Sequence, residues 1–187
     1  MKAIRILLLV MSVSLLASCS SVKVVTDMDK TVDFSQYKTY NFLGWQENSD
    51  KILNDFDRKR IHDAFISEFE ARGMKGVSEN GDMAVTLYIV VDQKTSTTAY
   101  TNYYGGGYGG YSRYRGGWGM GHATTTYSES DYLEGTLVMD VFDGASKDQV
   151  WQGVATSTVS ENPDKREKTI PSKVSALMKK FPVDPVK

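Results

Sequence analysis

Residues 83–93 read MAVTLYIVVDQ, and this stretch decides the fold. Successive side chains of a β-strand point to opposite faces of a sheet, so alternation with a period of two marks a strand. One set of alternate residues here is wholly apolar, and the other set is mixed. The pattern therefore predicts a strand with one face in the core and partial cover on the second face. The apolar set is Val85, Leu87, Ile89 and Val91, and the mixed set is Thr86, Tyr88, Val90 and Asp92.

Two more strands are predicted downstream. Residues 132–142 place Leu133, Leu137, Met139 and Val141 among more polar neighbours. Residues 143–147 read DGASK, a composition typical of a turn, and residues 149–159 form the returning strand of a hairpin. Together with 83–93, these segments predict an antiparallel meander.

Residues 54–72 carry the clearest helical pattern. Asn54 can accept a hydrogen bond from the first turn as N-cap, and Asp55 and Asp57 favour the positive end of the helix dipole. Gly73 provides the stop that a left-handed residue commonly gives. Spacings of three to five residues predict one apolar face, made of Phe56, Ile61, Ala64, Phe65 and Phe69.

A second helix is predicted near the C-terminus. Asn162-Pro163 is a helix-start signal, and Pro182 stops the pattern. Pro171 interrupts it, so either the helix kinks there or a second helix starts at that residue. The apolar face consists of Ile170, Val174, Leu177, Met178 and Phe181.

Strands are also expected near residues 22–25 and 39–43, so the order is β-β-α-β-β-β-α. This order predicts an α+β fold, a two-layer sandwich in which a mixed sheet of about five strands packs against two helices. Four regions are expected along the chain: a signal peptide at 1–18, a lipidated N-terminus and tether at 19–30, a single domain at 31–182 with a Gly/Tyr-rich insertion at 95–130, and a tail at 183–187.

The first 19 residues resemble a bacterial lipoprotein signal. Lys2 and Arg5 precede an uncharged run of 12 residues at 6–17, which ends in Leu16-Ala17, and Ser18 then leads to Cys19, the only cysteine of the chain. The run is shorter than the roughly 20 apolar residues that span a bilayer. The resemblance implies a diacylglyceryl group on the Cys19 thiol and an N-acyl group on its amine, which together anchor the chain to a membrane. The alternative is an ordinary cleaved signal in which the cysteine is incidental.

Ser20 bears on location. In enterobacterial lipoproteins an Asp at this position signals retention at the inner membrane, so Ser20 favours the outer membrane. The expected location is therefore the cell outer membrane, lipid-anchored and facing the periplasm. Cleavage before Cys19 would remove 18 of the 187 residues and leave 169, and losing two positive charges would take the net charge from −1 to −3. This acidic balance argues against a nucleic-acid partner.

Residues 95–130 differ from the rest in composition. Glycines alternate there with aromatic residues, and Thr and Ser runs flank them; these flanks could extend the hairpin beyond the core. The segment fits a solvated low-complexity insertion, a protein-contact arm, a sugar-stacking surface or, least well, a single-stranded nucleic-acid site. The candidate contact residues are Tyr100, Tyr103, Tyr104, Tyr108, Tyr111, Tyr114 and Trp118.

No catalytic set, metal cluster or cofactor motif is recognisable in the sequence. His62 and His122 each lack a second ligand at metal-binding spacing. Glu134 and Asp140 could act as paired carboxylates of a hydrolase. They would share the sheet face opposite the apolar one, a placement typical of a solvated face. A non-enzymatic role is therefore expected.

Four stretches resemble the bacterial lipoprotein family called domain of unknown function 4136. They read DFSQYKTY at 33–40, EGTLVMD at 134–140 with Asp143, VWQG at 150–153 and NPDKREK at 162–168, and a Gly/Tyr-rich insertion is also typical. The match runs from about residue 24 to 182, and Pro171 departs from the usual helix. Trp151 beside Gly153 indicates a large ring with a close neighbour, and Lys165, Arg166 and Lys168 indicate a solvated helix face.

The resemblance brings no molecular activity with it. Together with the anchor, it favours a non-enzymatic binding or envelope-assembly module. The partners expected are the membrane through Cys19 and either an envelope protein or a glycan. The alternative function is a glycan- or peptidoglycan-binding domain, and a hydrolase is less favoured.

Overall fold

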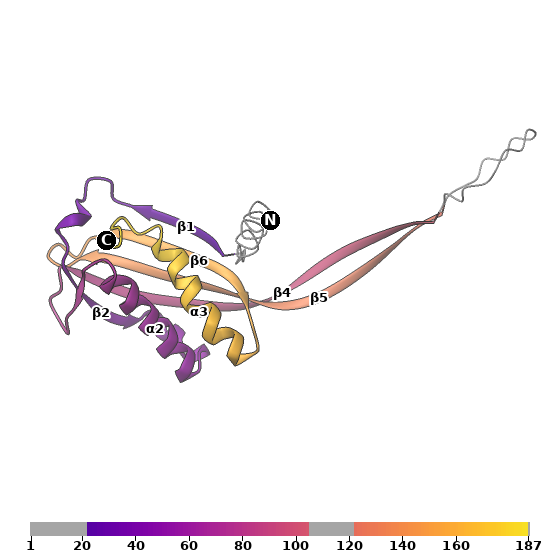
Figure 1. Ribbon diagram of the computed structural model, residues 1–187, viewed down its shortest axis with the longest axis horizontal. Coiled ribbons are helices and arrows are strands. Elements are labelled where there is room, and N and C mark those ends of the chain that lie inside the picture. Colours follow the sequence, from indigo (N-terminus) through magenta and orange to yellow (C-terminus); the bar gives the residue numbers. More distant parts are fainter. Residues whose placement is uncertain (1–21, 105–121, 187) are drawn as a thin grey trace, which may run out of the picture.

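The computed structural model describes residues 22–104 and 122–186. They form one six-stranded sheet with two helices on one face (Figure 1). The predicted α+β class and two-layer arrangement are confirmed; the sixth strand is a two-residue segment. The strands are β1 (Lys23–Met28), β2 (Thr39–Trp45), β3 (Lys75–Gly76), β4 (Met83–Tyr104), β5 (His122–Asp143) and β6 (Gln149–Val159), and the helices are α2 (Asp55–Glu70) and α3 (Pro163–Met178).

The sheet is mixed, with the strand order β1-β6-β5-β4-β2-β3. β2 and β4 are parallel neighbours joined through α2, which is the crossover that a strand–helix–strand order allows. β4, β5 and β6 form the antiparallel meander that the sequence predicts. The expected first strand is β1, which pairs along its whole length with β6.

The core lies between the sheet and the two helices. The apolar set of residues 83–93 faces it as predicted: Val85, Leu87 and Ile89 are all buried. Aromatic rings join the layers, since Tyr40 of β2 stacks on Phe69 of α2 with ring centroids 4.3 Å apart. The largest buried side chains are Trp151, Phe65, Phe69, Met83, Met139, Leu177 and Met178.

Gly153 makes room for Trp151. A Cβ added at Gly153 would lie 2.1 Å from the Trp151 ring and 2.7 Å from the Leu177 side chain, closer than real Cβ atoms approach. The ring of Trp151 also meets Phe181 edge-on at 5.3 Å. The close neighbour that the sequence indicates for this tryptophan is therefore the strand backbone itself, and α3 closes over both.

Helix α2 starts as predicted and differs from prediction in one core residue. The Asn54 side chain accepts a hydrogen bond from the Asp57 backbone N–H at 2.9 Å. Phe56 was expected on the apolar face, but it is 74% exposed, so that expectation is wrong. Phe56 lies five positions before Ile61, which places the two side chains about 140° apart around a helix of 3.6 residues per turn. Phe56 therefore points away from the face that Ile61 buries.

Helix α3 continues through Pro171. It runs as one helix of 16 residues, so the alternative in which a second helix starts at Pro171 is wrong. Proline leaves the carbonyl of Glu167 without its helical partner. Both Glu167 and Pro171 are exposed, so water can serve that carbonyl on the outer face of the helix.

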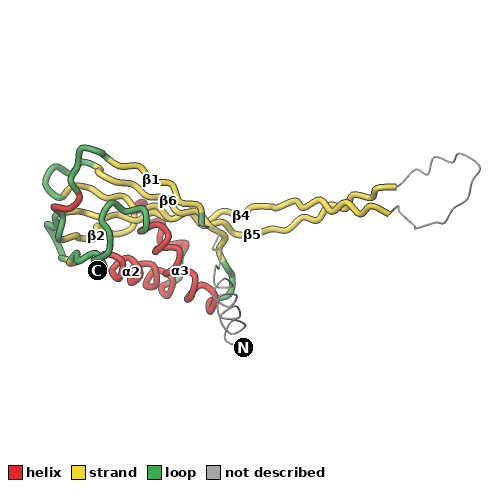
Figure 2. Tube along the Cα trace, turned by 45° about the horizontal axis from the view of Figure 1, so that its top comes forward, coloured by secondary structure: helices red, strands yellow, loops and turns green. Residues whose placement is uncertain are grey.

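β4 and β5 extend far beyond the other strands. Each has 22 residues, whereas β2 stops pairing with β4 at Leu87 and β6 pairs with β5 only as far as Leu133. The pairs from Thr95–Asp131 to Tyr104–His122 form a two-stranded ribbon that projects away from the body (Figures 1 and 2). We call this segment, residues 95–104 and 122–131, the ribbon. It confirms that the flanks of the insertion extend the hairpin.

Candidate functional site

The ribbon holds some of the residues expected to make contacts. Tyr100, Tyr103 and Tyr104 lie on the outer part of β4. The other four candidates, Tyr108, Tyr111, Tyr114 and Trp118, lie outside the described residues, as does Cys19. The structure therefore brings three of the seven aromatic candidates together on one strand.

Side chains at the inner end of the ribbon are polar and exposed. Asp131 accepts hydrogen bonds from the Thr95 hydroxyl at 2.8 Å and from Gln93 Nε2 at 3.2 Å. The Lys94 Nζ lies 3.9 Å from Asp92 Oδ2. Residues 92–99 and 128–131 are all exposed. Neither face of this inner part carries an apolar surface, so its contacts with a partner would rest on polar side chains and backbone.

Asp140 lies on the sheet face opposite the helices and is almost fully buried, at 8% exposure. Its Oδ1 accepts hydrogen bonds from Gln149 Nε2 at 2.8 Å and Gln152 Nε2 at 2.7 Å. Gln46 Nε2 donates to its Oδ2 at 3.3 Å and also to the Thr86 hydroxyl. The expected solvated face is therefore wrong at Asp140. The sequence pattern does not reveal that glutamines from two other segments would cover this carboxylate.

Glu134 and Asp140 do share a sheet face, as the sequence predicts. Glu134 pairs with Thr158 and Asp140 with Gln152, six residues apart along β5. At a rise of about 3.3 Å per residue the two positions are roughly 20 Å apart. Paired carboxylates of glycoside hydrolases lie about 5–9.5 Å apart. These two residues therefore do not form such a pair.

A second polar network lies at the end of the sheet remote from the ribbon. The Tyr37 hydroxyl donates to Asp143 Oδ2 at 2.9 Å. Burial and this neighbouring carboxylate raise the pKa of Tyr37 to about 12. Backbone N–H donation, chiefly from Ser146, and the tyrosine hydroxyl lower the pKa of Asp143 below its usual range. The pKa of Asp82 is lowered likewise, by the backbone N–H groups of Lys38 and Thr39.

This network explains part of the DFSQYKTY stretch. Asp82, just before β4, accepts the backbone N–H groups at the start of β2. Asp143 accepts both the Tyr37 hydroxyl and the Ser146 backbone N–H, which ties the segment before β2 to the turn between β5 and β6. A hollow of about 370 Å³ opens beside it. The carboxylates here act as structural acceptors.

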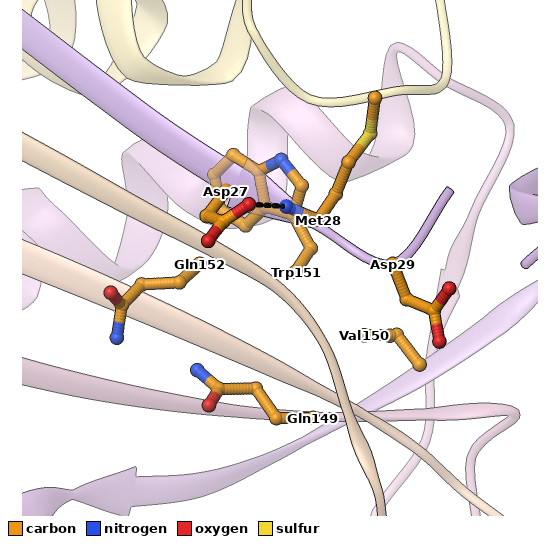
Figure 3. A pocket seen from close by; sticks show the side chains of 7 residues that line it. All are labelled: Asp27, Met28, Asp29, Gln149, Val150, Trp151 and Gln152. Atoms are coloured by element: carbon orange, nitrogen blue, oxygen red, sulfur yellow. Dashed lines mark hydrogen bonds between the residues drawn. The ribbon is translucent and has the colours of Figure 1, made fainter. Parts of the chain in front are cut away.

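Figure 3 shows a hollow at the β1–β6 edge, with a volume of about 290 Å³. The Asp27 carboxylate accepts the backbone N–H of Met28 at 2.9 Å, and the hydrogen bonds from Thr31 lower the pKa of Asp29. Gln149 and Gln152 extend beneath them, with their amide nitrogens bonded to Asp140. These polar groups are thus bonded within the fold.

An apolar crevice of about 90 Å³ lies between α2, α3 and the sheet. At its rim Asp57 joins the helices: it accepts hydrogen bonds from Arg60 and Arg166, each at 2.7 Å. The Arg166 side chain is only 17% exposed, so the expectation of a solvated helix face is wrong for this residue. Burial opposes ionisation of Asp57, but the two guanidinium groups outweigh it and lower its pKa.

The remaining expected features are simple to place. His62 is exposed, and the centroid of its ring lies 4.8 Å from the centroid of the Phe42 ring. His122 is the first residue of β5. Within residues 22–104 and 122–186, no three His, Cys, Asp or Glu side chains are grouped as metal ligands. Over the same residues, no helix has the length and hydropathy to cross a bilayer.

The fold and these surfaces define a two-layer α+β domain that carries a projecting two-stranded ribbon. The carboxylates that line the hollows named above are hydrogen-bonded within the fold; they are Asp27, Asp29, Asp57, Asp82 and Asp143. The chain belongs to the family described as Domain of unknown function (DUF4136), whose model matches residues 24–183. The resemblance drawn from the sequence is thereby confirmed.

A solved structure of low sequence identity shares the fold. A PDZ domain protein from Parabacteroides distasonis ATCC 8503 superposes with a TM-score of 0.53 and 13% identity, over 88% of this chain and 37% of that chain. This chain thus spans little more than a third of that protein. The PelC dodecamer from Paraburkholderia phytofirmans gives a TM-score of 0.45 at 9% identity, over 84% of this chain and 94% of that one. A comparison with curated proteins finds no match.

Proposed function

We propose that this chain is a lipid-anchored module of the outer membrane that faces the periplasm and makes protein contacts through its ribbon, without catalysing a reaction. The observation that carries the proposal is the ribbon itself. Two strands of 22 residues leave the body together, and a two-stranded hairpin is at best marginally stable in water by itself. A ribbon that contributes nothing to the core is most simply explained by contacts with another molecule.

The strand that follows the expected anchor, β1, begins at the end of the sheet from which the ribbon leaves. β1 begins at Lys23, which lies in one row across the sheet with Thr156 of β6, Thr136 of β5 and Val90 of β4. Val90 comes shortly before the ribbon. Cys19 precedes Lys23 by four residues, and an extended connection of that length spans at most roughly 14 Å. A lipid on Cys19 would therefore hold the base of the ribbon close to the bilayer.

The anchor has a direct test. Cys19→Ser keeps the size of the side chain but removes the thiol that carries the diacylglyceryl group. We expect this variant to leave the membrane pellet and to lose [³H]palmitate label, because several acyl chains are needed for stable anchoring. Ser20→Asp is the matched control: it should keep the label and move from the outer to the inner membrane fraction. Unchanged sedimentation of Cys19→Ser would contradict the anchor.

The contact role has a separate test. Residues 99–127 are replaced by an Asn-Gly turn, which connects Thr98 and Ser128 across a tight hairpin. Because Thr98 and Ser128 are cross-strand partners, the remaining ladder keeps its register. After cross-linking in intact envelopes and affinity purification, we expect the full chain to retain envelope proteins that the shortened chain has lost. Identical partners for both chains would remove the ribbon from the proposal.

A further inference from the structure

The outer edges of the ribbon expose backbone hydrogen-bonding groups. Within residues 22–104 and 122–186, no strand pairs with β4 beyond Ile89 on the side away from β5, and none pairs with β5 beyond Leu133 on the side away from β4. An uncovered edge presents a row of N–H and C=O groups that can pair with another strand. The ribbon therefore has two edges on which another strand could be added.

One hydrogen bond shows which residues of β4 have backbone N–H and C=O groups that point away from β5. The backbone N–H of Ile89 donates to the Ser49 hydroxyl at 3.1 Å, so it points away from β5. Backbone groups alternate in direction along a strand, and the β4–β5 register has no shift. The outward groups of β4 in the ribbon therefore belong to the odd-numbered residues 95–103. Their direct partners on β5, including Glu129 and Asp131, point their backbone groups outward on the opposite edge.

The two edges differ in charge. Natural edge strands are protected from pairing by charged side chains and proline. On β5, Glu129 and Asp131 are exposed within the ribbon. On β4, Lys94 is the last charged residue, and residues 95–104 read TSTTAYTNYY, with neither charge nor proline and with high β-propensity. The β4 edge is thus the unprotected one.

We propose that the β4 edge of the ribbon pairs with the β4 edge of a second copy of this chain. The pairing is antiparallel about a two-fold axis at Ala99, so that Thr97 faces Thr101 of the other copy and each interface is the same patch. Two hairpins, each marginally stable at best in water, then share one four-stranded backbone hydrogen-bond ladder.

The second copy is favoured over an unrelated peptide by self-complementarity. In this register the facing residues are Thr, Ala, Tyr, Ser and Asn, and no like charges meet. The ribbon projects away from the body (Figure 2), so antiparallel pairing would put the bodies of the two copies at opposite ends of the shared sheet and keep their net negative charges apart. This inference deepens the proposed contact role and rests on it.

The test compares two proline variants at directly paired positions. Thr97→Pro removes an outward N–H on the β4 edge, and Glu129→Pro removes the equivalent N–H on the β5 edge. Proline is tolerated at an edge where the N–H faces solvent. For the full chain purified in detergent, we expect light scattering to show a mass that doubles with rising concentration. Glu129→Pro should keep this doubling, and Thr97→Pro should lose it.

Two further measurements separate loss of pairing from loss of the ribbon. The amides of Ser96 and Thr98 bond within the ribbon and should stay protected from hydrogen exchange in Thr97→Pro. Ala99→Cys should form a disulfide-linked dimer on mild oxidation, since directly paired residues have Cα atoms about 5.5 Å apart, whereas Glu129→Cys should not. A wild-type mass of one chain at every concentration, or doubling that survives Thr97→Pro, overturns the inference. Because the Asn-Gly variant is scored on other envelope proteins, that failure leaves the proposed function standing.

Discussion

Trp151→Ala is expected to lower the free energy of unfolding by about 4 kcal/mol, among the largest effects of any single substitution in this chain. The side chain is 1% exposed, lies against the backbone at Gly153 and meets Phe181 edge-on. Its removal leaves a cavity that a β-strand backbone on one side and a helix on the other cannot close. The measurement is urea denaturation of the variant and the parent chain under the same conditions.

The matched control is Phe56→Ala. It also removes an aromatic ring, but from a helix position that is 74% exposed. We expect a change within about 0.5 kcal/mol, as for surface substitutions in general. Equal losses for the two variants would show that the core is not organised around Trp151.

The second large effect is expected at Asp57, whose carboxylate joins the N-terminal turn of α2 to α3. Asp57→Ala leaves Arg60 and Arg166 without their shared partner, and their side chains are only 23% and 17% exposed. Breaking such a partly buried pair typically costs about 3 kcal/mol. Asp63→Ala removes an exposed carboxylate that pairs with Lys59 on the same helix; it should cost less than about 1 kcal/mol.

The ion pairs of Asp57 with Arg60 and Arg166 also predict that stability depends on pH. The pKa of Asp57 is lower in the folded chain than in the unfolded chain, where an Asp titrates near about 3.9. Its contribution is therefore fully present above that value and is lost as the pH falls through the folded-state pKa. The stability difference between the parent chain and Asp57→Asn should shrink on acidification below about pH 4. A difference that stays constant down to pH 2 or so would contradict this account.

The sequence predicted the parts of the fold that depend on local periodicity. Alternation at 83–93 identified a core strand, and the Asn54 and Asn162 caps located both helix starts. The family resemblance came from motifs that fix turns and close packing, such as Trp151 with Gly153. These signals are short-range, so a single sequence is enough to read them.

Features that depend on distant segments were missed. The sequence predicts a solvated Asp140 because this residue lies opposite the apolar set of alternate residues in its strand. In the structure, Gln46 and two glutamines of β6 cover its carboxylate. Arg166 looked like part of a charged surface, although its partner lies on another helix. Hydrophobic periodicity carries no information on which polar side chains meet across elements, and the candidate site was predictable only as far as its location on the 95–130 insertion.

The length of the ribbon gives it a mechanical property. Ten successive pairs, from Thr95–Asp131 to Tyr104–His122, amount to a lever about 34 Å long. Among the described residues, flanking strands hold it only at its root, where β6 stops pairing at Leu133, the partner of Gln93. Rotating such a lever by about 10° sweeps its far end through roughly 6 Å. Small adjustments at the root therefore become large displacements at the far end, which widens the space that the ribbon can reach.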